Sequence, residues 1–133
     1  MTGQRILIVD DERDLLTSMD ITLRRSGYDI VPVDNGADAY VEIIVAHERG
    51  NQFDLLITDH HLPVLSGVEL IDRLLQEGIR IPFGVITAFG TNELISELVK
   101  RGSLFCLDKP FSIAELQKIV SLALLAARPT FPC

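Results

Sequence analysis

RILIVDDERDLLTSMDITLRRSG, at residues 5–27, predicts a buried strand followed directly by an amphipathic helix. Residues 5–9 contain an uninterrupted apolar run, which is typical of a strand that is covered on both faces. Residues 12–26 carry apolar side chains at helical spacing: Leu15, Leu16, Met19 and Leu23. Gly27 ends this predicted helix. A buried strand that leads into an amphipathic helix is the repeating unit of a parallel α/β sheet.

The same alternation continues along the chain. Further strands are predicted at residues 28–33, 53–58, 82–87 and 103–107. Further helices are predicted at residues 37–48, between Ser66 and Gly78, at residues 91–101, and from Ser112 to Leu124. Five strand–helix units in succession predict a parallel sheet with helices on both faces. We therefore expect one domain of ordinary size over residues 1–127, with residues 128–133 as a tail or the stub of a linker.

Local signals support the helices and one edge of the sheet. Ser66 with Glu69, and Ser112 with Glu115, have the spacing of capping boxes, and Thr91 is a further predicted cap. Pro32 lacks a backbone N–H, so the second strand is predicted to lie near an edge. The side chains predicted to face inward are Ala39, Ile43, Ile44 and His47 in the second helix, Val68, Ile71, Leu74 and Leu75 in the third, and Leu94, Ile95, Leu98 and Val99 in the fourth.

Composition restricts the classes of function. The chain has 133 residues, 47% of them hydrophobic and 23% charged, as expected for one globular domain. The net charge of −7 argues against direct contact with nucleic acid. No apolar run approaches the ~18 residues of a membrane span. Cys106 and Cys133 have neither disulfide nor metal spacing, so we expect a cytoplasmic protein in a reducing compartment.

Reactive side chains follow four of the predicted strands. Ligands of open parallel α/β sheets bind at the carboxyl ends of the strands. The residues at these ends are Asp10 and Asp11 after the first strand, Asp59 after the third, Thr87 and Ala88 at the fourth, and Lys109 with Pro110 after the fifth. Because Lys109 precedes a proline, its peptide bond is also predicted to be cis.

This set of groups suits transfer of a phosphoryl group. Two carboxylates ~4 Å apart repel each other by about 4 kcal/mol at an effective dielectric constant near 20. Hard oxygen ligands favour Mg²⁺, with Mn²⁺ as the alternative cation. Asp59 is the best candidate nucleophile because its strand is central. Lys109, the Thr87 hydroxyl and the Ala88 backbone N–H would hold the phosphoryl oxygens.

Four motifs together resemble the response-regulator receiver family of two-component signalling. They are VDDE at 9–12, TDHHLPVLSG at 58–67, ITA at 86–88 and KPF at 109–111. The resemblance covers about residues 4–126, and the order and spacing of the four motifs make it specific. It implies a doubly wound, flavodoxin-like (β/α)5 fold with the strand order 2-1-3-4-5.

The resemblance also implies roles for the site residues and a set of partners. Asp59 resembles the phosphoacceptor. Asp11 resembles a direct Mg²⁺ ligand, Asp10 resembles a ligand or a holder of metal-bound water, and the His61 backbone carbonyl resembles another ligand. Thr87 resembles the switch hydroxyl, and Lys109 resembles the phosphate-binding lysine. The phosphodonor would be a sensor histidine kinase or a phosphotransfer protein, and the domain would catalyse its own phosphotransfer and dephosphorylation. The face formed by the last two helices and the strand between them would signal to an output domain or effector protein. A homodimer through the same face is left open.

The sequence departs from the family pattern in two places. The family carries an aromatic switch residue three positions before the lysine, where this chain has Cys106. Phe105 cannot replace it, because adjacent strand residues face opposite sides. Without the aromatic residue, Thr87 should affect the face formed by the last two helices and the strand between them through a smaller repacking. Near the phosphate, Phe89 and His61 add bulk, which we expect to shield the phosphorylated site from water.

Each motif also has a simpler structural interpretation. Asp10 and Asp11 could cap a helix, Asp59 could form an Asx-turn, and Thr87 and Lys109 could be ordinary strand and surface residues. The joint occurrence of these residues favours the functional interpretation. His60 and His61 are poorly placed to chelate one metal ion, because adjacent residues rarely do so.

Three other functions compete with signalling. A phosphatase of the haloacid-dehalogenase type needs a second acid two residues after the nucleophile, where this chain has His61. A flavodoxin-like cofactor binder needs phosphate-binding donors in the first loop, which here contains Asp10, Asp11 and Glu12. A degenerate receiver that only binds proteins would not need the complete set of acids, threonine and lysine.

Overall fold

The structure, a computed structural model, describes residues 3–127 and has the predicted doubly wound α/β fold. All strand pairs are parallel, and the order in the sheet is β2-β1-β3-β4-β5. The strands are β1 (Arg5–Val9), β2 (Asp29–Val33), β3 (Leu55–Asp59), β4 (Phe83–Thr87) and β5 (Cys106–Asp108). The helices are α1 (Arg13–Arg25), α2 (Gly36–Glu48), α3 (Gly67–Gln76), α4 (Asn92–Lys100) and α5 (Ile113–Ala126). The predicted tail at residues 128–133 lies outside the described residues.

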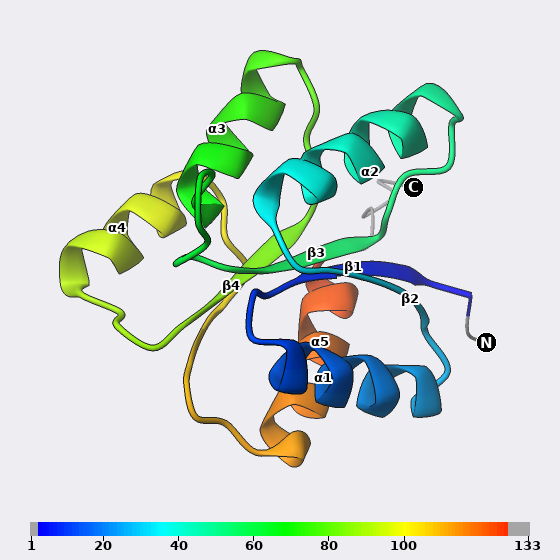
Figure 1. Cartoon of the computed structure of the whole chain (residues 1–133), viewed down its shortest axis with the longest axis vertical. Coiled ribbons are helices and arrows are strands. Elements are labelled where there is room, and N and C mark those ends of the chain that lie inside the picture. Colours follow the sequence, from blue (N-terminus) through cyan, green and yellow to red (C-terminus); the bar gives the residue numbers. More distant parts are fainter. Residues whose placement is uncertain (1–2, 128–133) are drawn as a thin grey trace, which may run out of the picture.

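Helices cover both faces of the sheet (Figure 1). Helices α1 and α5 lie on one face, and α2, α3 and α4 lie on the other. Alternate residues of a strand enter different cores, so that Ile6 and Ile8 pack towards α1 and α5, whereas Leu7 and Val9 pack towards α2 and α3. The central strands β1 and β3 are therefore shielded on both sides, and their carboxyl ends are held rigidly at one edge.

The helix termini form as the sequence predicts. Both capping boxes, Ser66 with Glu69 and Ser112 with Glu115, are present, and the Thr91 side chain accepts a hydrogen bond from the Leu94 N–H. These caps satisfy backbone donors that a helix leaves unpaired in its first turn. Helices α3, α4 and α5 therefore begin at defined residues directly beside the carboxyl edge of the sheet.

Two predictions about helix faces and one about a strand are wrong, and one buried helix residue was not predicted. His47 is exposed and Ala46 is buried in its place, because the buried stripe of α2 runs through positions 36, 39, 43 and 46. Val99 of α4 is 64% exposed. Leu70 of α3 is fully buried but was not among the predicted inward residues. Strand β5 spans Cys106–Asp108 rather than residues 103–107, since its register with β4 pairs only the stretch from Val85 to Thr87.

The loop between β3 and α3 contains a strained residue that gives a stability prediction. Val64 is 98% exposed and has a φ of 70°, which β-branched residues rarely adopt. Such strain costs about 1–3 kcal/mol, whereas glycine adopts this conformation freely at an entropic cost of about 0.5–1 kcal/mol. We expect Val64→Gly to raise the free energy of unfolding by about 1 kcal/mol, measured by urea denaturation. Val64→Ala keeps the Cβ and should give a smaller gain; an equal gain would mean that the Cβ is not the source of strain.

Candidate functional site

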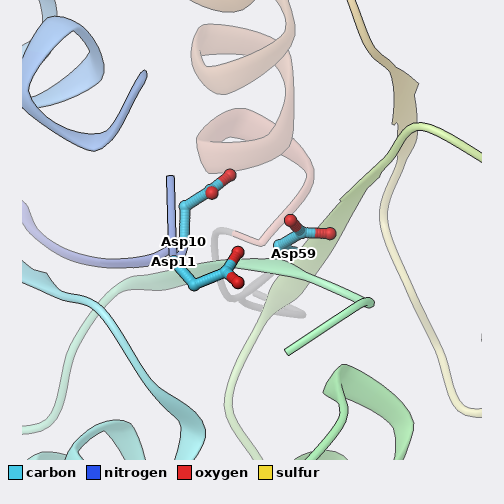
Figure 2. Close-up of side chains that lie close together, drawn as sticks. All are labelled: Asp10, Asp11 and Asp59. Atoms are coloured by element: carbon cyan, nitrogen blue, oxygen red, sulfur yellow. The ribbon is translucent and has the colours of Figure 1, made fainter. Parts of the chain in front are cut away.

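Three aspartates meet at the carboxyl edge of the sheet (Figure 2). Asp10 and Asp11 follow β1, and Asp59 is the last residue of β3, the neighbouring strand. One carboxylate oxygen from each residue lies within 4.8 Å of the other two. Asp10 is 0% exposed and Asp59 is 4% exposed, whereas Asp11 is open to solvent. The arrangement is a semi-enclosed oxygen site with one open side.

Lys109 lies opposite these carboxylates and reaches into the same pocket. Its Nζ lies 2.8 Å from Asp59 Oδ2, 2.9 Å from Asp10 Oδ2 and 3.1 Å from Glu12 Oε1. Its backbone N–H donates a hydrogen bond to the Thr87 carbonyl, and its peptide bond to Pro110 is cis, as predicted. The backbone of β4 therefore holds the lysine in place, and its ammonium group is the local counterion of the acidic cluster.

The electrostatics of the pocket show an excess of negative charge. Burial raises the pKa of Asp10, and the favourable contacts with Lys109 and the Glu12 N–H do not cancel this effect. Burial alone would lower the pKa of Lys109, but its contacts with Asp59 and Asp10 outweigh burial and raise the pKa. The ammonium therefore stays charged at neutral pH, while one buried carboxylate remains poorly compensated.

Asp10 Oδ2 gives a direct test of whether a cation suits this site. This oxygen is buried and accepts no hydrogen bond within the described residues; it forms an ion pair with Lys109 Nζ at 2.9 Å. Buried oxygens without hydrogen bonds are rare in folded proteins. The donors nearby are carboxylates, which are the ligands that hard divalent cations prefer. The residues present therefore fit a divalent metal ion.

Thr87 and its neighbours form the side of the pocket at the end of β4. Thr87 is fully buried, and its Oγ1 accepts a hydrogen bond from the Phe89 N–H at 3.1 Å. Ala88, the next residue, is exposed at the open edge. Strand β4 pairs directly with β3, so these groups end beside Asp59. The Thr87 hydroxyl hydrogen can still turn towards a group bound at this edge.

Two ring-bearing residues, His61 and Phe89, follow Asp59 and Thr87 by two positions each. The His61 N–H donates to Asp59 Oδ1 at 3.1 Å, and its ring contacts that of Phe89 edge to face, with centroids 5.7 Å apart. Phe89 is 74% exposed. His60 has a buried Nδ1 without a partner, and burial, followed by the charge of His61, lowers the pKa of His60. The cluster of potential metal ligands in the described residues contains the three aspartates and neither histidine.

The residues at the switch position point to opposite faces of the sheet. Phe105 packs in the core beneath α1 and α5, and its ring covers Gly84, where an added Cβ would lie 2.2 Å from the ring. Cys106 is half-buried and packs on the core beneath α2, α3 and α4. Burial raises the pKa of the Cys106 thiol, which keeps it neutral. Phe105 therefore does not stand in for the absent aromatic side chain at residue 106.

Glu12 is a site residue that the sequence pattern does not predict. Its carboxylate contacts Lys109, and its backbone N–H donates to Asp10 Oδ1 at 2.8 Å. In the sequence it appears only as the last letter of the VDDE motif and as the residue before α1. A long side chain on a loop can reach several neighbours, so the sequence alone does not determine which of them it contacts.

The comparison with known proteins agrees with this geometry. A family model described as the response regulator receiver domain matches residues 6–121. The chain belongs to the response-regulator receiver family. A receiver domain is a phosphorylation-dependent switch of two-component signalling, which interacts with histidine kinases or phosphotransfer proteins and with output domains.

Individual relatives support the assignment to receiver domains. Sporulation initiation phosphotransferase F of Bacillus subtilis is 32% identical, over 90% of this chain and 93% of that protein. Response regulator protein PilR of Pseudomonas aeruginosa is 34% identical, over 97% of this chain but only 28% of its own length. The signal receiver domain of a Luxo repressor protein from Vibrio parahaemolyticus has a TM-score of 0.81 and 30% identity, covering 94% of this chain and 92% of that chain.

The chain spans only part of the length of some of its relatives. The chain spans 28% of PilR and 48% of the transcriptional regulatory protein PrrA of Mycobacterium tuberculosis. In both cases the match covers a part of a longer protein.

Among residues 3–127, no helix is both long and apolar enough to cross a membrane.

Proposed function

We propose that Asp59 is the phosphoacceptor of this receiver domain and that it takes its phosphoryl group from a phosphohistidine. The observation that carries the proposal is the 2.8 Å contact between Lys109 Nζ and Asp59 Oδ2, inside a cluster of three aspartates. A carboxylate oxygen of Asp59 attacks phosphorus, the P–N bond of the phosphohistidine breaks, and the imidazole nitrogen keeps the bonding electrons. The product is an aspartyl phosphate.

The remaining groups have distinct tasks in this reaction. Asp10, Asp11, Asp59 and the His61 backbone carbonyl would hold Mg²⁺, with Mn²⁺ as a substitute. When bound, the cation offsets the charge of the carboxylates and of the phosphoryl oxygens. Lys109, the Thr87 hydroxyl and the Ala88 N–H would bind phosphoryl oxygens. Transfer then depends on positioning and charge neutralisation, which rigid strand ends supply.

The proposed partners follow from this chemistry and from the exposed surface. The donor would be a sensor histidine kinase or a phosphotransfer protein in the cytoplasm, and residues 1–127 would form the functional unit. The output partner would bind the face of α4, β5 and α5; these elements and the loop before β5 carry Val99, Leu104 and Leu122, which are 64%, 38% and 55% exposed. Exposed large apolar residues favour a protein–protein contact at this face. Cys106 lies within the same face, so its repacking on phosphorylation should be smaller than that of an aromatic residue.

The direct test is the response to Mg²⁺ with beryllofluoride, which mimics the phosphoryl group. Amide resonances of residues around the pocket should shift in the wild type. Asp59→Asn should abolish the shift, because this variant lacks the carboxylate that beryllofluoride binds. Asp20→Asn, an acid on the α1 surface that pairs with Arg24, is the matched control and should respond normally. A response that survives in Asp59→Asn would exclude Asp59 as the acceptor.

The rings beside Asp59 give a prediction about the lifetime of the phosphorylated state. The His61 N–H donates to Asp59 Oδ1 and the rings of His61 and Phe89 contact each other, so we expect the two rings to limit the approach of water. We expect Phe89→Ala to accelerate dephosphorylation about fivefold, which corresponds to ~1 kcal/mol in activation free energy. The measurement is loss of radiolabelled phosphate after removal of the donor. Leu125→Ala, at an exposed apolar residue of α5, is the control; equal rates in all three proteins would refute the shielding.

A further inference from the structure

Glu12 links two essential groups of the pocket but has no assigned role in the proposed reaction. Its backbone N–H holds Asp10 Oδ1, and its Oε1 lies 3.1 Å from Lys109 Nζ. It precedes α1 at the N-cap position, yet its side chain makes no capping hydrogen bond. The side chain is 65% exposed, whereas those of Asp10 and Asp59 are 0% and 5% exposed. The carboxylate is therefore directed to Lys109 rather than to the helix.

Lys109 has as many carboxylate neighbours as it has N–H donors. An ammonium group carries three N–H donors, and Asp10, Asp59 and Glu12 surround it. Within the proposed function, Asp59 receives the phosphoryl group and Asp10 would hold the metal ion. Glu12 alone has no other task, and its side chain is the most exposed of the three.

We propose that Glu12 is a placeholder anion, which occupies the donor of Lys109 that a phosphoryl oxygen takes on phosphorylation. The inference rests on the proposed function of Asp59 and Lys109. The carboxylate keeps the lysine oriented in the resting protein and must leave when the phosphoryl group arrives. Since both are anions competing for one ammonium, Glu12 weakens the binding of phosphoryl groups and sets a threshold for the switch.

The direction and the size of the effect follow from the exposure of Glu12. Glu12→Gln removes the competing charge and keeps the shape of the side chain. A partly exposed ion pair has a small coupling energy, so we expect affinity for beryllofluoride to rise about two- to fivefold. Salt screens exposed charges more than buried ones. The difference between Glu12→Gln and the wild type should therefore shrink at high ionic strength.

The experiment measures the affinity for beryllofluoride at saturating Mg²⁺, by NMR titration of amide resonances at low and at high salt. It compares the wild type, Glu12→Gln and Asp14→Asn. Asp14 is the matched control because it is exposed, lies two residues away in the first turn of α1, and loses the same charge. The wild type and Asp14→Asn should bind equally, and Glu12→Gln should bind more tightly, by a larger factor at low salt than at high salt.

Each other outcome has a defined meaning. Unchanged or weaker binding by Glu12→Gln would overturn the placeholder role, because the carboxylate would then be inert or would only orient the lysine. An equal gain in Asp14→Asn would overturn it as well, since general surface charge would explain the effect. If wild-type protein fails to bind beryllofluoride while it remains folded, the proposed function itself fails, and the inference fails with it.

Discussion

Replacing Lys109 by methionine is expected to lower the free energy of unfolding of the metal-free protein by about 3 kcal/mol. Methionine keeps the length of the apolar stem, so the change removes mainly the ammonium group. Asp10 and Asp59 would remain buried with no cation beside them. Breaking one side of a buried ion pair costs more than losing a surface pair, because the remaining charges cannot reach water.

Urea unfolding in the presence of a chelator measures this effect, and a second series with Mg²⁺ tests its cause. The metal should restore part of the lost stability, because it binds the folded carboxylates and not the unfolded chain. Lys118→Met is the control, since Lys118 is exposed on α5 and has no ion pair among the described residues. Equal stability of Lys109→Met and Lys118→Met would contradict the account of the pocket.

Replacing Asp10 by asparagine is expected to change metal binding and stability in opposite directions. The Mg²⁺ affinity should fall at least about tenfold, because a charged oxygen is lost from a site of three aspartates. The metal-free protein should become more stable by about 1 kcal/mol, because a neutral amide replaces a fully buried carboxylate. The amide oxygen can still accept the hydrogen bond from the Glu12 N–H.

The sign of the second effect follows from the raised pKa of Asp10. Burial, the largest cause, raises this pKa, so folding disfavours the ionised form at neutral pH. Lys109 keeps Asp59 and Glu12 as partners when Asp10 is neutral. Metal titration and urea unfolding of Asp10→Asn, with Asp14→Asn as control, test both effects. Lower stability together with unchanged Mg²⁺ affinity would show that Asp10 is a structural residue only.

Much of the fold follows from the apolar runs and from the residues that end them. The strands at residues 5–9 and 53–58 contain the uninterrupted apolar runs 6–9 and 55–57, and only a sheet covered on both faces buries such runs. Parallel strands bring their carboxyl ends to one edge. The proximity of Asp10, Asp59 and Lys109 could therefore be predicted from strand ends that lie far apart in the sequence.

The remaining features depend on tertiary contacts that periodicity does not contain. Strand β5 is short because its register with β4 admits only three residue pairs, although residues 103–107 are apolar enough for a longer strand. Helix α2 carries apolar residues on several sides, so the choice between Ala46 and His47 is made by the rotation of the helix on the sheet. The contact of Glu12 with Lys109 depends on side-chain conformations in a loop and on an exposed carboxylate.

The central claim is that Asp59 receives the phosphoryl group, and locating that group tests it most directly. The protein would be phosphorylated with acetyl phosphate and Mg²⁺ and treated with borohydride, which reduces an aspartyl phosphate to homoserine. Mass spectrometry of the peptide that carries His60 and His61 as well as Asp59 then identifies the modified residue. We predict homoserine at residue 59 alone. Phosphate on His60 or His61, with Asp59 unchanged, would contradict the account.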